Sequence, residues 1–120
     1  METSDAIGVL SALAQEGRLA AFRFLVRAGP EGAPAGDIAR ALDVAPNTLS
    51  AQLSLLANAG LIGSRRDGRS IIYAANYDAI GALIVYLMED CCGGKPEICA
   101  PVLAAARCAP ASTRARRGRG

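Results

Sequence analysis

The sequence predicts a mainly α-helical fold that contains one small β-hairpin. Its length of 120 residues suits a single domain with one hydrophobic core. Apolar residues make up 52% of the chain but aromatic residues only 4%, which favours close-packed helices over a β-sandwich or barrel. Apolar residues also recur at helical intervals, except over residues 61–73, where the pattern is that of a hairpin.

Three helices are predicted in the first third of the chain. The first follows a Thr3 or Ser4 cap, and the second begins near Gly17 and ends before residues 29–34, which form a loop on composition alone. Pro34 suits the first turn of a short third helix, because a helix needs no amide hydrogen there. The sequence therefore predicts two longer helices and a short one before a tight connection.

A fourth helix and a hairpin follow that connection. Pro46 suits the first turn of the helix, and Gly60 suits the residue just after its end. The helix carries three leucines at helical spacing, namely Leu49, Leu53 and Leu56. The strands at 61–66 and 69–73 flank Asp67-Gly68, a two-residue turn in which both residues tolerate positive φ. A short helix, a second helix and a basic hairpin in this order predict a winged helix-turn-helix.

The chain after the hairpin predicts a helix in the interface of a homodimer. Residues 77–88 are apolar almost all round, with one stripe formed by Ile80, Leu83, Ile84 and Leu87. Such a helix must be covered on two sides, which dimerisation achieves simply. A last helix is predicted from Pro96 to about Arg107. We therefore expect a folded domain over 1–107 and a disordered, Arg-rich tail over 108–120.

The composition of the chain and the distribution of its charges exclude several classes of function. The chain has no His, which excludes His-based acid–base catalysis, His-paired nucleophiles and His-containing metal sites. Residues 1–106 carry a net charge of −3 and the last fourteen residues +5, so overall charge does not predict DNA binding. An acidic N-terminus and the lack of a long apolar run predict no secretion signal and no membrane span. We expect a cytoplasmic protein that is not an enzyme.

Two groups of residues are predicted to contact DNA. The fourth helix presents short polar or amide side chains that can read base edges, namely Asn47, Thr48, Ser50 and Gln52. The hairpin tip carries cations for phosphate or minor-groove contact, namely Arg65, Arg66 and Arg69. Two plainer interpretations stay open, an ordinary polar helix face and edge-strand protection by charge. The Arg tail either adds non-specific attraction or is only solvated.

Four short segments are characteristic in their order and spacing, namely Leu-Ala-Gln-Glu-Gly-Arg-Leu at 13–19, Gly-Asp-Ile-Ala at 36–39, Asn-Ala-Gly-Leu-Ile at 58–62 and Arg-Arg-Asp-Gly-Arg at 65–69. Through these segments the sequence resembles the arsenic-repressor (ArsR/SmtB) family from about residue 6 to residue 99. The resemblance implies a homodimeric repressor that pairs through its first and fifth helices. It also implies release from double-stranded operator DNA when a metal or metalloid binds. The family's best-known arsenic site, a Cys-x-Cys at the short third helix, has no counterpart in residues 34–38.

A cluster of thiols after residue 90 is the predicted sensing site. Cys91 and Cys92 diverge by about 100° in a regular helix, but Gly93-Gly94 can interrupt the helix and let both sulfurs converge, and Cys99 can then close the site. Three soft thiolates suit As(III) or Sb(III). This spacing resembles family members whose metalloid site lies at the end of the fifth helix. The sequence therefore predicts Cys91, Cys92 and Cys99 as ligands.

Other interpretations of the thiols stay open. Cys91 and Cys92 can be small buried hydrophobic residues, and Cys108 can be an unused thiol or a fourth ligand that completes a tetrahedral zinc site. A thiol redox-sensing repressor, in which Cys99 joins Cys91 or Cys92, is the main alternative function. A zinc-stapled interaction module that does not bind DNA is another. A thiol oxidoreductase is disfavoured because the chain has no Cys-x-x-Cys.

Overall fold

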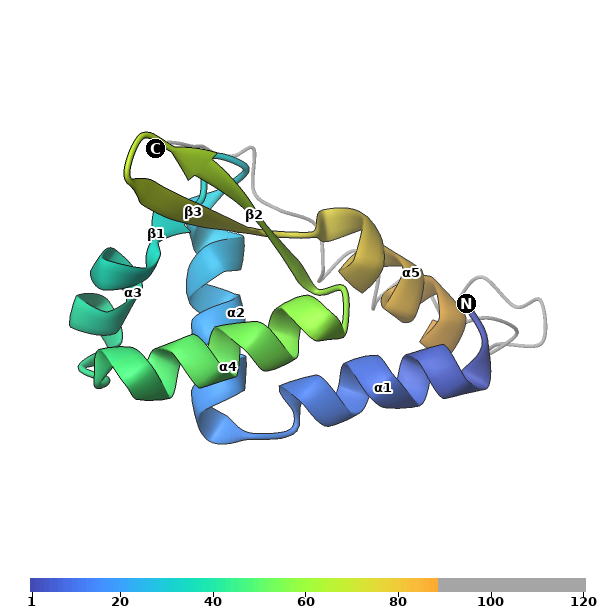
Figure 1. The fold of residues 1–120 in the computed structure, drawn as a ribbon. Helices are drawn as coiled ribbons and strands as arrows, with labels where there is room; N and C mark the ends of the chain where they lie inside the picture. The colour runs from blue at the N-terminus through green and yellow to red at the C-terminus, as the bar shows by residue number, and fades with distance from the viewer. Residues whose placement is uncertain (89–120) are drawn as a thin grey trace. The chain divides into compact units, whose positions relative to one another are not determined.

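The computed structural model describes residues 1–88, and these residues confirm the predicted fold class of helices with a small antiparallel sheet (Figure 1). The elements in chain order are α1 (Thr3–Leu13), α2 (Glu16–Ala28), β1 (Ala33–Pro34), α3 (Ala35–Leu42), α4 (Pro46–Asn58), β2 (Ile62–Asp67), β3 (Ser70–Ala75) and α5 (Tyr77–Met88). Residues 1–86 form one compact unit. The predicted helix at 96–107, the boundary at 107 and the tail lie outside the described residues.

The N-terminal caps of α1 and α2 set where these helices begin. Glu2, not the expected Thr3 or Ser4, is the N-cap of α1, because its backbone N–H donates to the Asp5 carboxylate at 3.1 Å. At α2, the Gln15 side-chain oxygen accepts from the Arg18 backbone N–H at 2.8 Å. In each cap a backbone N–H donates to a side-chain oxygen three residues away, and one helical turn brings residues at this spacing together.

The segment predicted as a loop over 29–34 ends in a short strand, so that prediction was wrong for its last two residues. Ala33 and Pro34 form β1 and pair with Tyr73 and Ile72 of β3, which makes the strand order β1-β3-β2. Gly32 precedes the strand at φ 74°, and a Cβ there would meet the Tyr73 carbonyl oxygen. A glycine is therefore required where the backbone of this loop approaches β3.

The hairpin turn lies one residue later than predicted. The ladder continues to the Asp67–Ser70 pair, so the two turn residues are Gly68 and Arg69. Gly68 has φ 64°, whereas Asp67 stays in the strand. A glycine at the first position of a two-residue turn matches the twist of an antiparallel pair. The wing therefore carries Arg69 in its turn and Arg65 and Arg66 in β2.

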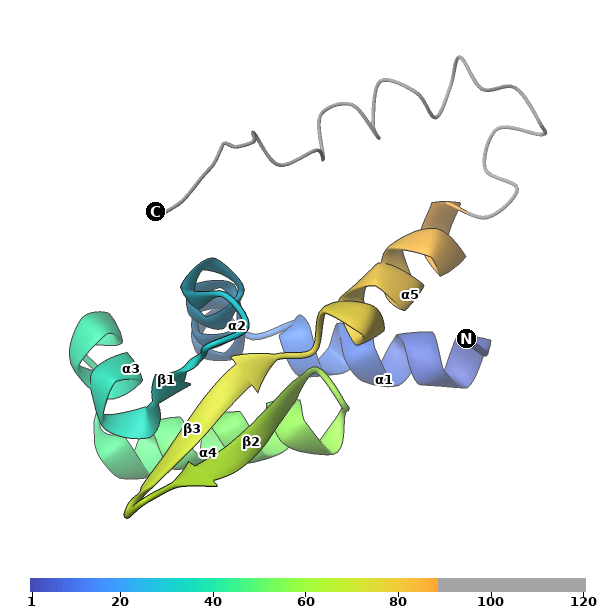
Figure 2. The same ribbon diagram turned by 90° about the horizontal axis from the view of Figure 1, so that it is seen from above.

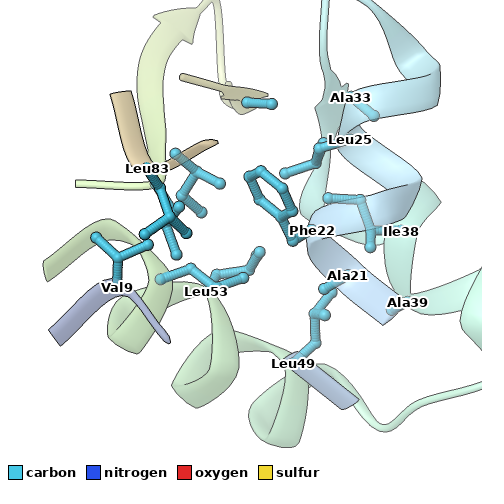
Figure 3. Close-up of a cluster of buried hydrophobic side chains, with 14 of the residues drawn as sticks. Val9, Ala21, Phe22, Leu25, Ala33, Ile38, Ala39, Leu49, Leu53 and Leu83 are labelled. Carbon is cyan, nitrogen blue, oxygen red and sulfur yellow. The ribbon is translucent and has the colours of Figure 1, made fainter. Parts of the chain in front are cut away.

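One hydrophobic core holds the described elements together (Figure 3). Its most deeply buried side chains come from α2, α3, α4 and the start of the hairpin, namely Leu25, Ile38, Leu49, Leu53, Leu56 and Leu61. Phe22 of α2 lies in the middle of this cluster (Figure 3). The leucine periodicity of α4 was therefore predicted correctly, and its Gly60 follows the helix at φ 81° as expected. Within residues 1–88, every helix is too short or too polar to cross a membrane.

Residues 1–88 cover only part of the predicted apolar stripe of α5. Leu83 is buried at 3% exposure and Ile80 packs against the core, but Ile84 is 48% exposed and Leu87 52%. The core of residues 1–88 covers one side of this helix and leaves much of its apolar surface exposed.

Candidate nucleic-acid interface

The α3–α4 pair forms a helix-turn-helix around a tight connection. Asp43 adopts a left-handed conformation with φ 55°, and the next amide, that of Val44, donates to the Ala39 carbonyl at 3.0 Å. Ile38 of α3 and Leu49 of α4 are buried on the inner side of the turn. The N-terminal end of α4, α3 and the tip of the hairpin lie toward the same side of the molecule in both Figure 1 and Figure 2.

The first turns of α4 expose three of the four predicted base-reading residues. Asn47, Thr48 and Ser50 are exposed, whereas Leu49 between them is buried. The Asn47 side-chain oxygen accepts from the Thr48 backbone N–H at 3.0 Å. Its NH₂ group has no hydrogen-bond partner within residues 1–88, so it remains able to donate to a base edge or a phosphate. No charged residue lies in α4.

The fourth predicted base-reading residue, Gln52, lies elsewhere than the sequence suggested. It is half-buried, and its amide Nε2 lies at Gly17 near the start of α2, where a Cβ would collide with it. Its Oε1 is buried without a hydrogen-bond partner among the described residues. Gln52 follows Leu49 by three residues and precedes Leu56 by four, so it borders the buried stripe rather than the outer face. The expectation that Gln52 points away from the core was wrong.

The outer stripe of α4 includes a residue that the sequence analysis did not single out. Ser54 is exposed and follows Asn47 by seven residues, which places both on one helix face. The same periodicity that identified the leucine stripe could have identified Ser54. The exposed polar face therefore continues for one more turn beyond Ser50.

The three wing arginines have different surroundings. Arg65 donates from Nη2 to the Glu31 carbonyl oxygen at 2.8 Å, which ties β2 to the loop before β1. Arg66 is paired with Ile71 across the hairpin, on the opposite face from Arg65, and Arg69 lies in the turn. Within residues 1–88, Arg66 and Arg69 make no side-chain hydrogen bond or ion pair. Their guanidinium groups are exposed and available to an external anion.

Comparisons with known proteins agree with this geometry. The family described as a helix-turn-helix domain matches residues 8–65. The HTH-type transcriptional regulator YgaV of Escherichia coli (strain K12) is 30% identical over 88 residues, which cover 73% of this chain and 87% of YgaV. Both matches are to proteins with a helix-turn-helix, and YgaV is described as a transcriptional regulator.

Two solved structures show the same arrangement. One is the winged helix-turn-helix domain of Mb0332 from Mycobacterium bovis, described as homodimeric and as a possible ArsR-family regulator. It is 27% identical with a TM-score of 0.59, over 72% of this chain and 81% of that one. The other is an ArsR-like regulator from Rhodococcus sp. RHA1, with a TM-score of 0.65 at 23% identity, over 87% of this chain and 94% of that one.

The chain belongs to the ArsR family of winged-helix transcriptional regulators. In its helix-turn-helix, α4 has the place of the recognition helix and β2–β3 that of the wing. The predicted ligand residues Cys91, Cys92 and Cys99 lie outside the described residues, as does Cys108. Within residues 1–88, no group of three His, Cys, Asp or Glu side chains is placed to hold a metal ion.

Proposed function

We propose that this ArsR-family regulator is a homodimeric repressor that leaves its operator when As(III) or Sb(III) binds Cys91, Cys92 and Cys99. The observation that carries the DNA-binding part is the outer face of α4, which presents exposed polar side chains beside a wing with two arginines that have no partner among residues 1–88. The metalloid part rests on the spacing of the cysteines in the sequence.

DNA contact is divided between two elements of different chemistry. The N-terminal turns of α4 enter the major groove, and Asn47, Thr48 and Ser50 meet base edges there. Because α4 carries no charge, attraction to phosphate comes from Arg66 and Arg69 of the wing. Arg65 holds the wing against the β1 loop and contributes less to DNA contact. Gln52 supports α4 from the inner side.

The dimer forms through the apolar surfaces that residues 1–88 leave open on α1 and α5. Ile7 and Leu10 of α1 are 58% and 42% exposed, and Ile84 and Val85 of α5 are 48% and 66% exposed. Burial of four such side chains in each protomer is strongly favourable. The homodimeric state described for Mb0332 supports the same assembly here. A dimer also places two recognition helices on successive major grooves, about 34 Å apart.

The thiol site would act by changing the geometry of this dimer. An ion lowers operator affinity only as far as it binds one dimer geometry better than the other, and DNA must weaken ion binding by the same factor. Thiolates, not thiols, bind the ion, so induction should weaken toward acidic pH. No organic cofactor is needed.

A strictly anaerobic titration tests this function. Reduced protein is bound to a fluorescent operator duplex, obtained by selection from random DNA, and arsenite is added while anisotropy is followed. We expect stoichiometric release with the wild type and with Cys108→Ser, and no release with Cys99→Ser.

Two results would contradict the proposal in different ways. Release that requires an oxidant supports the redox-sensing repressor instead. Failure of Cys108→Ser to respond replaces the three-thiol site by one that includes Cys108. Antimonite in place of arsenite then measures which of the two ions the site prefers.

A further inference from the structure

Asn76 joins three parts of the fold at the point where β3 ends and α5 begins. Its side-chain oxygen accepts from the Ala79 backbone N–H at 3.2 Å, as an N-cap of α5 does. Its side-chain NH₂ donates to the Gly60 carbonyl at 3.0 Å, and its backbone N–H donates to the Leu61 carbonyl at 2.8 Å. The Asn76 side-chain amide therefore bonds to the first turn of α5 with its oxygen and to the residue after the C-cap of α4 with its nitrogen.

The partners of Asn76 are attached firmly to the recognition helix. The Gly60 amide donates to the Ala57 carbonyl and the Leu61 amide to the Leu56 carbonyl, each at 3.0 Å, which closes the C-terminal end of α4. Leu61 is fully buried in the core. Gly60 and Leu61 therefore move with α4, and Asn76 connects α4 to the first turn of α5. In Figure 1 the chain passes from α4 into β2 beside the start of α5.

The other side-chain hydrogen bonds of α5 lead to different helices. The Tyr77 hydroxyl donates to the Val26 carbonyl at 3.0 Å, at the C-terminal end of α2. The Tyr86 hydroxyl lies 2.6 Å from the Thr3 hydroxyl of α1. Among the side-chain hydrogen bonds of residues 1–88, the Asn76–Gly60 bond is the one that links the start of α5 to the end of α4.

We propose that Asn76 is a positioning residue that fixes the angle between α4 and α5 and thereby the separation of the two recognition helices in the dimer. This inference rests on the proposed function, because it needs α5 to pair two copies. When α5 lies at the dimer axis and α4 on the DNA, the joint between them sets where each α4 meets its groove. A looser joint lets the two α4 helices reach half-sites at more than one spacing.

An Asn76→Asp substitution separates this role from simple capping of α5. Aspartate keeps an oxygen acceptor for the Ala79 amide but has no NH₂ to donate to Gly60, and its charge faces a carbonyl oxygen. Tyr77→Phe is the matched control, because it removes the neighbouring bond to α2 and leaves Asn76 intact. Both changes lie away from the DNA-facing side of α4.

The test measures affinity as a function of half-site spacing. The full-length dimer is titrated on its selected operator, on versions with one base pair added or removed between half-sites, and on an isolated half-site. We expect the wild type and Tyr77→Phe to lose about tenfold in affinity for each altered spacing, because one base pair rotates a half-site by roughly 35°. We expect Asn76→Asp to lose no more than about threefold for each altered spacing, because its looser joint lets α4 reach the shifted half-site, and to bind the isolated half-site as the wild type does.

Each failure has a distinct meaning. A wild type that shows no preference for paired half-sites overturns the proposed homodimeric repressor and this inference with it. An Asn76→Asp variant with the wild-type spacing profile overturns the positioning role alone. If thermal melting shows that Asn76→Asp does not fold, Asn76→Ser, which keeps a capping hydroxyl on a shorter side chain, is measured with the same expectation.

Discussion

Helices α4 and α5 are nearly equal in length but differ in what surrounds them. In α4, Leu49, Leu53 and Leu56 are at most 1% exposed, and the opposite side exposes the polar Asn47, Thr48, Ser50 and Ser54. In α5, Leu83 alone is buried, and Val85 is 66% exposed. Within residues 1–88, the leucine stripe of α4 is thus covered and Leu55 alone of its leucines is exposed, at 48%, whereas most of the apolar surface of α5 is not covered. The difference separates the face proposed to bind DNA from the face proposed to bind a second copy.

The inner face of α4 should show the largest effect of any single change. Leu56→Ala removes a fully buried side chain and leaves a cavity, so we expect a loss of about 2–5 kcal/mol in the free energy of unfolding. Denaturant unfolding at fixed protein concentration measures it. Ile84→Ala on α5 serves as the control when both variants are unfolded at a protein concentration below the dimer dissociation constant, where we expect a loss of less than about 1 kcal/mol. Equal losses at both positions would contradict the contrast between the helices.

The exposed face of α5 should control assembly. Ile84→Asp places a charge in the proposed interface, so we expect the dimer dissociation constant to rise about 100-fold. Analytical ultracentrifugation measures this constant. Leu19 of α2 is 43% exposed, close to the 48% of Ile84, which makes Leu19→Asp a matched control that should leave the dimer intact. A dimer that tolerates Ile84→Asp would remove α5 from the interface.

The outer and inner sides of α4 should differ in base preference. Asn47→Ala should lose about 1–3 kcal/mol of discrimination at the base pair it contacts, and it should change the selected sequence at that position. Gln52→Ala should leave the selected sequence unchanged, because the Gln52 amide packs at Gly17. Selection from random duplexes with each variant measures both. A shifted preference in Gln52→Ala alone would show that Gln52 turns outward on DNA.

The wing should show a contrast between neighbouring arginines. Arg66→Ala should weaken binding to all sequences alike and reduce the slope of log affinity against log salt by about one per protomer, hence about two per dimer. Arg65→Ala should change that slope by less than half as much, because Arg65 is bound to the Glu31 carbonyl. Fluorescence anisotropy across a salt series provides the slopes. The reverse order would exchange the roles of the two residues.

The smallest expected effect concerns the start of α5. Burial raises the pKa of the Tyr77 hydroxyl above its usual value of 10.0. The neutral hydroxyl, which donates to Val26, is therefore favoured in the folded chain, and its stabilisation is present below pH 10 and lost as the pH rises through the raised pKa. Tyr77→Phe should cost about 1 kcal/mol at neutral pH and flatten the alkaline fall in stability. Thermal unfolding between pH 7 and 11 measures both.

Local patterns in the sequence predicted most of the fold. Helix α4 begins at Pro46 and ends before Gly60 as expected, because a proline, a glycine and a leucine stripe specify it without distant partners. Strand β1 was not predicted, because its two residues become a strand only by pairing with Tyr73 and Ile72, about forty positions later. The hairpin turn shifted by one residue because Gly68, rather than Asp67, takes the positive φ.

The candidate site was predicted correctly where local periodicity decides the direction of a side chain, and wrongly where distant contacts decide it. Asn47 and Ser50 could be placed outside the core from helical periodicity alone. Gln52 lies at the border of the buried stripe, where periodicity does not decide the direction of a long side chain, and contact with Gly17 decides it. The role of Arg65 depends on Glu31, thirty-four residues earlier. Contacts between distant segments therefore account for both corrections.

Hydroxyl-radical footprinting of the full-length protein on its selected operator, with and without arsenite under anaerobic conditions, tests the central claim most directly. A homodimer that reads DNA through α4 should protect two half-sites about one helical turn apart, and arsenite should remove both protections together. Protection of a single half-site, or an unchanged footprint when arsenite is bound to the protein, would contradict the account.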